Sequence, residues 1–260
     1  MNPTGLFLAG LACLAAPAFA APPPQPVTIV AHRGLTPGMP ENTLAAFRGA
    51  AERGVAVIEL DLRSTRDGHI VVMHDPTVDR TTKGSGRVAD MTLASIKTLE
   101  VAKRGAQVPT FAEALQAMSG TGTRLLLDIK PGTPLDKVIG DVRRHHAEAR
   151  VIFGLRHASD IARVRRELPT ATALAFMPGA SDAPTHAAAG AQIIRLWSDW
   201  VVADPALVKR TKELGPSVWV MVGRRLPARK REWRSLHARL IELGADGIVT
   251  DRPDLVKAPK

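Results

Sequence analysis

Carboxylates interrupt two apolar runs of the 260-residue sequence in a pattern suited to metal binding. In the run 57–62 (VIELDL), Glu59 and Asp61 share one face of an extended strand. A parallel strand covered on both faces should be almost wholly apolar, so this pair needs a compensating cation. Asp128 breaks the run 124–129 (RLLLDI) in the same way. The three carboxylates form an all-oxygen ligand set, which suits Mg²⁺, Ca²⁺ or Mn²⁺ better than zinc.

An ordinary network of ion pairs is the alternative interpretation of these acids. Arg63, Arg66 and Lys130 lie close enough in the sequence to serve as their partners, and structural ion pairs also collect at the ends of strands. Lys130 has the same strand parity as Asp128. As a compact positive charge it could equally meet a phosphoryl group.

Two strand-like runs end in a histidine. The run 27–31 (VTIVA) leads into His32 and Arg33, and the run 69–73 (HIVVM) leads into His74. Two imidazoles at one site fit a general acid and a general base on either side of a single bond. The planar guanidinium of Arg33 is suited to hold phosphoryl oxygens.

The elements that must position these residues alternate between strand and helix. Eight apolar runs are predicted strands: 27–31, 57–62, 124–129, 150–154, 171–176, 192–197, 217–222 and 246–250. Helical patterns fill most gaps between them, at 42–53, 134–147, 158–167, 203–214 and 229–243. This alternation predicts a parallel sheet, and eight strands in one domain predict a closed (β/α)₈ TIM barrel. An open doubly wound sheet is the structural alternative.

One strand-like run departs from this rhythm. Only the turn at Asp67-Gly68 separates 69–73 from the second strand, and so short a connection makes an antiparallel hairpin. We therefore expect a hairpin after the second strand, followed by a small inserted loop and short helix over about 77–108. The barrel domain as a whole is expected to span 27–257.

The N-terminal segment has the pattern of a secretory signal peptide. Residues 1–20 combine an apolar core with Pro17 and the small-residue site Ala18-Phe19-Ala20. The sole cysteine, Cys13, falls inside this segment, so the mature chain would offer no thiolate ligand. Residues 21–26 (APPPQP) form a Pro-rich lead-in. The prediction is an exported protein, periplasmic or secreted; a disordered or buried N-terminal arm is the alternative.

The charge of the chain favours an anionic partner. Lys and Arg outnumber Asp and Glu by 35 to 25, a formal net charge of +10. Nucleic-acid binding is not expected, because aromatic residues are only 4%, Tyr is absent and no binding motif occurs. The basic run around Trp233 allows peripheral membrane contact at most, and a solvated helix face explains it equally. We therefore expect a small-molecule phosphodiester substrate; the oligomeric state is not indicated.

Taken together, these motifs resemble the glycerophosphodiester phosphodiesterase family. The likeness is dense in HRGLTPGMPENTLAAF (32–47), IELDLRSTRDGHIVVMHDPTVDRTT (58–82) and LLLDIKP (125–131), and it returns in GADGIVTDRPDLV (244–256). It implies metal-dependent hydrolysis of glycerophosphodiesters to glycerol phosphate and an alcohol. A phospholipase D-like enzyme on intact lipids and a non-catalytic lipid- or phosphate-binding barrel are the rival functions.

The resemblance also implies residue roles. His32 and His74 match the catalytic histidines. The remaining matches are Glu59, Asp61 and Asp128 to the metal carboxylates, and Arg33 and Lys130 to the phosphate-contacting residues. In the PENT turn, Asn42 is expected to cap the first helix and Glu41 to brace the mouth of the barrel.

Two positions depart from the family pattern. Asp128 stands where the family commonly has Glu, although the related sphingomyelinase D branch also uses Asp. The second departure is in the seventh strand, which reads WVMVG at 219–223 where the family often has a polar or WTVN-like end. Trp219 and Met221 share a face of this strand, and they are candidates to line the pocket for the alcohol. Ordinary core packing explains these two residues equally well. A further candidate pocket wall follows the sixth strand: Arg195, Trp197 and Trp200.

Overall fold

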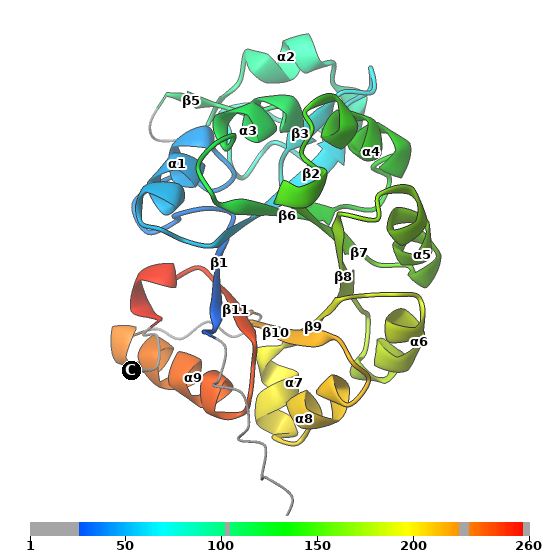
Figure 1. Ribbon diagram of the computed structural model, residues 1–260. Helices are drawn as coiled ribbons and strands as arrows, with labels where there is room; N and C mark the ends of the chain where they lie inside the picture. Colours follow the sequence, from blue (N-terminus) through cyan, green and yellow to red (C-terminus); the bar gives the residue numbers. More distant parts are fainter. Residues whose placement is uncertain (1–25, 102–104, 224–228, 257–260) are drawn as a thin grey trace, which may run out of the picture.

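Eight parallel strands close into a barrel in the computed structural model, which describes residues 26–101, 105–223 and 229–256. They are β1 (Thr28–His32), β2 (Val57–Ser64), β6 (Arg124–Ile129), β7 (Val151–Leu155), β8 (Thr172–Phe176), β9 (Ile193–Trp197), β10 (Ser217–Met221) and β11 (Gly247–Thr250). Their order around the barrel is β1-β11-β10-β9-β8-β7-β6-β2 (Figure 1). Pairing of β2 with β1, with His32 beside Glu59, completes the circle. The predicted TIM barrel is therefore confirmed, and the open sheet is excluded.

Helices ring the outside of the barrel (Figure 1). They are α1 (Leu44–Glu52), α3 (Phe111–Ala117), α4 (Leu135–Arg144), α5 (Ala158–Glu167), α6 (Ala183–Ala188), α7 (Ser198–Ala203), α8 (Leu207–Lys212) and α9 (Lys230–Glu242). The expectation that Asn42 caps the first helix is wrong. Thr43 is the cap, because its hydroxyl accepts a hydrogen bond from the Ala46 amide. Asn42 adopts a left-handed φ of 57° instead, and its side chain turns toward the strands.

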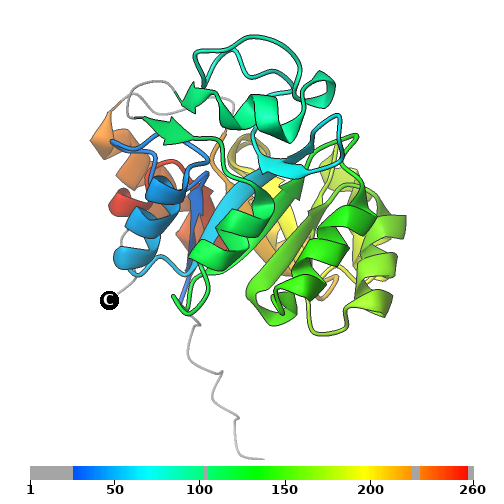
Figure 2. The same cartoon turned by 90° about the horizontal axis from the view of Figure 1, so that it is seen from above.

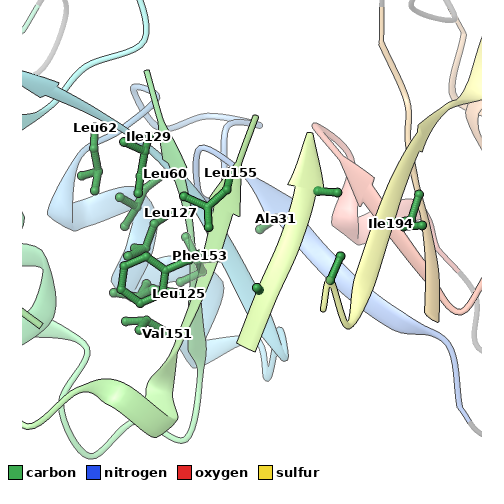
Figure 3. Close-up of a cluster of buried hydrophobic side chains, with 14 of the residues drawn as sticks. Ala31, Leu60, Leu62, Leu125, Leu127, Ile129, Val151, Phe153, Leu155 and Ile194 are labelled. Atoms are coloured by element: carbon green, nitrogen blue, oxygen red, sulfur yellow. The ribbon is translucent and has the colours of Figure 1, made fainter. Parts of the chain in front are cut away.

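Residues alternate between the two faces of each strand. The outward-facing set packs under the helices as one large apolar cluster, part of which is shown in Figure 3: Ala31, Leu60, Leu62, Leu125, Leu127, Ile129, Val151, Phe153, Leu155 and Ile194. The inward-facing set forms a second cluster: Val30, Val57, Leu126, Ile152, Leu174, Phe176, Ile193, Trp219, Met221 and Val249. Toward the ends of β1, β2 and β6 the same inward parity carries His32, Glu59, Asp61 and Asp128. The barrel interior is thus apolar below and polar at the end where the strands finish.

The hairpin after β2 is present. Strand β3 (Ile70–Val72) pairs antiparallel with β2, with Leu62 opposite Val72. The chain then forms the short helix α2 (Leu93–Lys97) and a two-stranded sheet of β4 (Glu100–Val101) and β5 (Ala106–Gln107). The sequence did not predict this sheet. A small apolar core of its own holds the segment together: Val71, Met73, Val78, Val88, Ile96, Val101 and Val108. In Figure 2 the segment stands over one end of the barrel.

The predicted signal peptide (1–20) and most of the lead-in (21–26) lie outside the described residues, as does residue 257. Among the helices of the described ranges, none has the length and apolar character needed to cross a bilayer.

Candidate active site

A cavity of about 630 Å³ opens at the end of the barrel where the strands finish. Its size is that of an ordinary small-molecule site. Most of its lining residues are polar or charged, and several were singled out from the sequence: His32, Arg33, Glu41, His74, Asp128, Lys130, Arg195 and Trp197. Phe176, Met221, Arg156, Asp251 and Thr36 also line it. Most of the predicted site residues, from distant parts of the chain, therefore meet in one place.

The three predicted metal carboxylates converge. Glu59, Asp61 and Asp128 are all buried, and each offers an oxygen within 4.8 Å of the others. The Oε1 atom of Glu59 is buried and has no hydrogen-bond partner among the described residues. Burial first, and the charge of Asp61 second, raise the pKa of Glu59 to about 8. The charged form of Glu59 is therefore unfavourable without a further cation nearby, which fits a site built to receive one. The hard oxygen donors suit a divalent ion such as Mg²⁺ or Ca²⁺.

Cationic side chains share the same carboxylates. The Lys130 ammonium lies 2.6 Å from Asp61 Oδ1 and 2.5 Å from Asp128 Oδ2, and Arg156 donates to Asp128 Oδ1 at 2.6 Å. Burial would raise the pKa of Asp61, but the charges of Lys130 and Arg33 outweigh it and lower that pKa to about 2. The ion-pair network considered as an alternative is therefore present in part, and it coexists with the convergent carboxylates. Of the partners expected from the sequence, Lys130 pairs with these acids, whereas Arg63 donates to the His74 carbonyl instead.

Arg33 occupies a tightly fitted corner beside the carboxylates. Its backbone amide donates to Glu59 Oε2 at 3.0 Å, and its Nε lies 3.3 Å from Asp61 Oδ2. The backbone there is left-handed at Arg33 (φ 57°) and at Gly34 (φ 88°). A Cβ on Gly34 would lie 2.8 Å from the Ala46 Cβ, so only glycine lets α1 approach this closely. The left-handed backbone at Arg33, which is unfavourable for a residue other than glycine, places its guanidinium beside the carboxylates.

Each of the two histidines is anchored by a carboxylate through its Nδ1 atom. His32 Nδ1 lies 2.6 Å from Asp251 Oδ1, and His74 Nδ1 lies 2.6 Å from Asp75 Oδ1. This arrangement places the Nδ1 proton toward the carboxylate and reserves Nε2 for chemistry. Burial lowers the pKa of His32, but the charge of Glu59 and the Asp251 hydrogen bond outweigh it and raise the pKa. Burial lowers the pKa of His74 below its ordinary value, although Asp61 and Asp75 oppose it.

Arg80, from the inserted segment, ties these groups together. Its Nε donates to Asp75 Oδ2 at 2.5 Å, and its two terminal nitrogens donate to the Glu41 carboxylate at 2.9 and 2.7 Å. Glu41 also accepts from Arg33 at 3.1 Å, which is the bracing position expected for it. These contacts link His74, through Asp75, Arg80 and Glu41, to Arg33. Arg33 in turn lies beside the three buried carboxylates. Arg80 was not singled out from the sequence.

Other contributors were also missed by sequence reasoning. Asp251 follows β11, and Arg156 follows β7, each on the inward parity of its strand. Asn42 was expected only as a helix cap, but its amide donates to Asp61 Oδ2 at 2.7 Å. Inward parity was available as a signal for Asp251 and Arg156, but a single charged residue after a strand is common on any barrel.

Trp219 does not line the cavity. It lies in the packed layer below, where its indole fills the space that Gly247 leaves: a Cβ on that glycine would lie 2.7 Å from the ring. The core-packing alternative therefore describes Trp219, while Met221, one layer higher, does reach the cavity. Trp200 is not among the lining residues either, although its ring lies 5.9 Å from the guanidinium carbon of Arg195.

The fold and the site together define a TIM-barrel hydrolase of phosphate esters. The chain belongs to the glycerophosphoryl diester phosphodiesterase family, whose profile matches residues 32–255. A glycerophosphodiester phosphodiesterase of Caldanaerobacter subterraneus subsp. tengcongensis is 33% identical over 240 residues, covering 87% of this chain and 94% of its own.

Solved structures of the same family share the barrel. The glycerophosphodiester phosphodiesterase of Agrobacterium tumefaciens has a TM-score of 0.74 and 27% identity, covering 88% of this chain and 98% of its own. A phosphodiesterase of Oleispira antarctica, solved with the product sn-glycerol-3-phosphate, has a TM-score of 0.74 and 22% identity, covering 88% and 94%. The latter likeness concerns the fold.

Proposed function

We propose that this chain hydrolyses glycerophosphodiesters to glycerol phosphate and an alcohol, with one of the residues His32 and His74 acting as general base and the other as general acid. The observation that carries the proposal is the convergence of two features: both carboxylate-anchored histidines line one cavity, and so does Asp128, which forms a buried cluster with Glu59 and Asp61. Membership of the family and the named activity of its 33% identical relative support the same reaction.

The positively charged side chains around the carboxylates bind the substrate. Arg33 presents a planar donor group and Lys130 a compact charge, and both line the cavity. A phosphodiester carries one negative charge, which these groups offset. Because Arg33 and Lys130 are themselves fixed by Asp61, the phosphoryl group is held in one orientation relative to both imidazoles. Such positioning lowers the barrier by preparing the reacting atoms in advance.

Proton transfer falls to the two Nε2 atoms. One imidazole takes the proton from the attacking oxygen, and the other gives a proton to the departing alcohol oxygen. Asp251 and Asp75 keep the two rings oriented and stabilise their positively charged forms. Glu59, Asp61 and Asp128 would hold a divalent cation, Mg²⁺ or Ca²⁺ with Mn²⁺ as a further candidate. When bound, such an ion supplies positive charge that offsets the charge developing on the phosphoryl oxygens.

The rival functions have less support. An enzyme that acts on intact lipids needs an apolar rim at its cavity. In the described ranges the exposed large apolar side chains are Val202 and Leu214, and neither lines the cavity. A non-catalytic phosphate-binding barrel does not require two imidazoles that are each held by a carboxylate at Nδ1. A small soluble phosphodiester is therefore the proposed substrate, with peripheral membrane contact at most and no nucleic-acid partner.

Export is a separate proposal that rests on the sequence alone. The apolar segment and small-residue site of residues 1–20 support cleavage before Ala21, which would give a periplasmic or secreted enzyme. Intact-mass measurement of exported protein tests it. A soluble product that retains residues 1–20 would disprove it.

The proposed reaction is tested with a panel of glycerophosphodiesters and intact phospholipids, each assayed with and without a chelator. We expect glycerol phosphate to be released from the glycerophosphodiesters in a chelator-sensitive manner. Turnover of intact lipids alone would instead support the phospholipase D-like function. Absence of any turnover at saturating metal would contradict hydrolysis.

A further inference from the structure

The cavity has a second cationic side that the proposed chemistry does not use. Arg195 projects inward from β9 and lines the cavity. In the circular strand order β9 lies opposite β2, since three strands separate them in either direction (Figure 1). Arg195 therefore faces the cavity from across the barrel relative to Glu59 and Asp61. We call Arg156, Phe176, Arg195 and Trp197 the aromatic–arginine wall; all four line the cavity.

Guanidinium groups already lie against the aromatic rings of this wall. The guanidinium carbon of Arg195 lies 4.1 Å from the Trp197 ring centroid and 5.2 Å from that of Phe176. Arg156 lies 5.4 Å from the same Phe176 ring. These distances fall within the range of cation–π attraction. Gly223 packs against the indole as well, because a Cβ there would lie 2.2 Å from a Trp197 ring carbon.

This arrangement decides which charge the wall can accept. An aromatic cage binds a quaternary ammonium group when its ring faces await a cation. Here Phe176 and Trp197 each have a guanidinium within that range, so a second cation would meet like charge. A carboxylate or phosphate would instead meet the planar donors of Arg195. The Arg156 guanidinium beside it adds positive charge, although its terminal nitrogens already donate to Asp128 and to the Ile129 carbonyl.

From this geometry we propose that the aromatic–arginine wall selects glycerophosphodiesters whose alcohol carries an anionic group, and that Arg195 determines this specificity. The proposal rests on the hydrolysis proposed above and names its substrate class. The proposal assigns the wall to the alcohol, because the charge of the alcohol differs among substrates of the class, whereas the glycerol half is uncharged in all of them. The cavity of about 630 Å³ has room for both halves of such a diester.

The test is a set of three soluble diesters of glycerol phosphate that share one linkage. Their alcohols are choline, glycerol and glyceric acid, which are cationic, neutral and anionic. We expect kcat/KM of the wild type to fall in the order glycerate, glycerol, choline. A wild type that prefers the choline diester, or that does not distinguish the three, overturns the specificity while leaving hydrolysis intact. Failure to hydrolyse any of them overturns the proposed function itself.

The variant Arg195→Met tests whether this one side chain determines the specificity, since the substitution removes the charge and keeps much of the side-chain length. We expect kcat/KM for the glycerate diester to fall at least about tenfold, the smallest loss expected for one charge-assisted hydrogen bond. The choline diester should be unaffected or improved. Arg195→Lys, which retains a charge, should keep part of the preference.

Arg239→Gln is the matched control. Arg239 is an exposed side chain of α9 that pairs with Glu242, and its replacement removes the same charge from the protein away from the cavity. We expect the wild-type order in this variant. An equal loss on all three substrates in Arg195→Met, or the same change of order in Arg239→Gln, would overturn the role of Arg195.

Discussion

Asp251 and His32 are joined by a contact of 2.6 Å between Oδ1 and Nδ1, across 219 residues of sequence. His32 ends β1 and Asp251 directly follows β11, and these neighbouring strands pair in parallel. Closure of the barrel is thus what brings the carboxylate to the imidazole. The contact fixes the ring so that Nε2 is the atom available for proton transfer.

Asp251→Asn should therefore lower kcat with a smaller effect on KM. The amide no longer stabilises the charged imidazolium, and it can reverse the tautomer of His32. We expect a loss of about ten- to a hundredfold, part of the contribution of general acid–base catalysis. Asp254→Asn is the control, because the Asp254 carboxylate is held by Arg252 of the same loop. Equal activity of the two variants would contradict the orienting role.

His32→Ala and His74→Ala should each lower turnover by at least about a hundredfold. Both side chains line the cavity, so their removal should leave folding intact, which circular dichroism checks. His69→Ala serves as the control, since His69 is an exposed residue of the turn between β2 and β3. A folded double variant with wild-type turnover would show that the two histidines do not carry the chemistry.

Arg80→Gln should uncouple the inserted segment from the site. Arg80 holds both Glu41 and Asp75, and Asp75 in turn orients His74. We expect kcat to fall about tenfold, a part of the acid–base contribution, while the protein remains folded. Arg87→Gln removes an exposed arginine of the same segment and should behave as wild type. Indistinguishable kinetics of the two variants would argue against the positioning role.

Strand parity was the most informative signal in the sequence. It predicts that Glu59, Asp61 and Asp128 share one inward face, and the barrel brings them within 4.8 Å of one another. The signal works because an acid in a buried strand is conspicuous against its apolar neighbours. Asp251 and Arg156 obey the same parity, but each follows its strand, where a charged residue is unremarkable.

The depth of an inward-facing side chain along the barrel axis could not be predicted from the sequence. Trp219 has the inward parity of Met221, yet only the latter reaches the cavity. The difference depends on how neighbouring strands are staggered, and Trp219 stands beside Gly247 in the observed register. That glycine provides the space for the indole below the cavity. Stagger is a property of the closed barrel and leaves no local trace in one strand.

The burial of His237 leads us to expect that the folded protein loses stability in acid, independently of catalysis. It is buried in α9 with Nε2 3.0 Å from Thr250 Oγ1, and burial lowers its pKa to about 4 from a usual 6.5. The unfolded chain therefore takes up a proton near pH 6.5 that the folded chain resists, so stability falls as pH drops from 6.5 toward 4. The full effect is about 3 kcal/mol.

Denaturant unfolding at several pH values between 4 and 7 measures this effect. His237→Gln removes the titrating group, so its free energy of unfolding should depend less steeply on pH than that of the wild type. His69→Gln provides the exposed control and should retain the wild-type slope. An unchanged slope in His237→Gln would assign the acid sensitivity elsewhere.

The central claim is tested most directly by titrating metal into chelator-stripped protein while following glycerophosphodiester hydrolysis. We expect Mg²⁺, Ca²⁺ or Mn²⁺ to restore wild-type turnover. Asp128→Asn should require at least about tenfold more metal, the scale of even indirect changes around an ion, with turnover partly recovered at high concentration. Asp136→Asn, an exposed acid on α4, should titrate as wild type. Full activity of the stripped wild type, or an unchanged metal dependence in Asp128→Asn, would contradict the metal site.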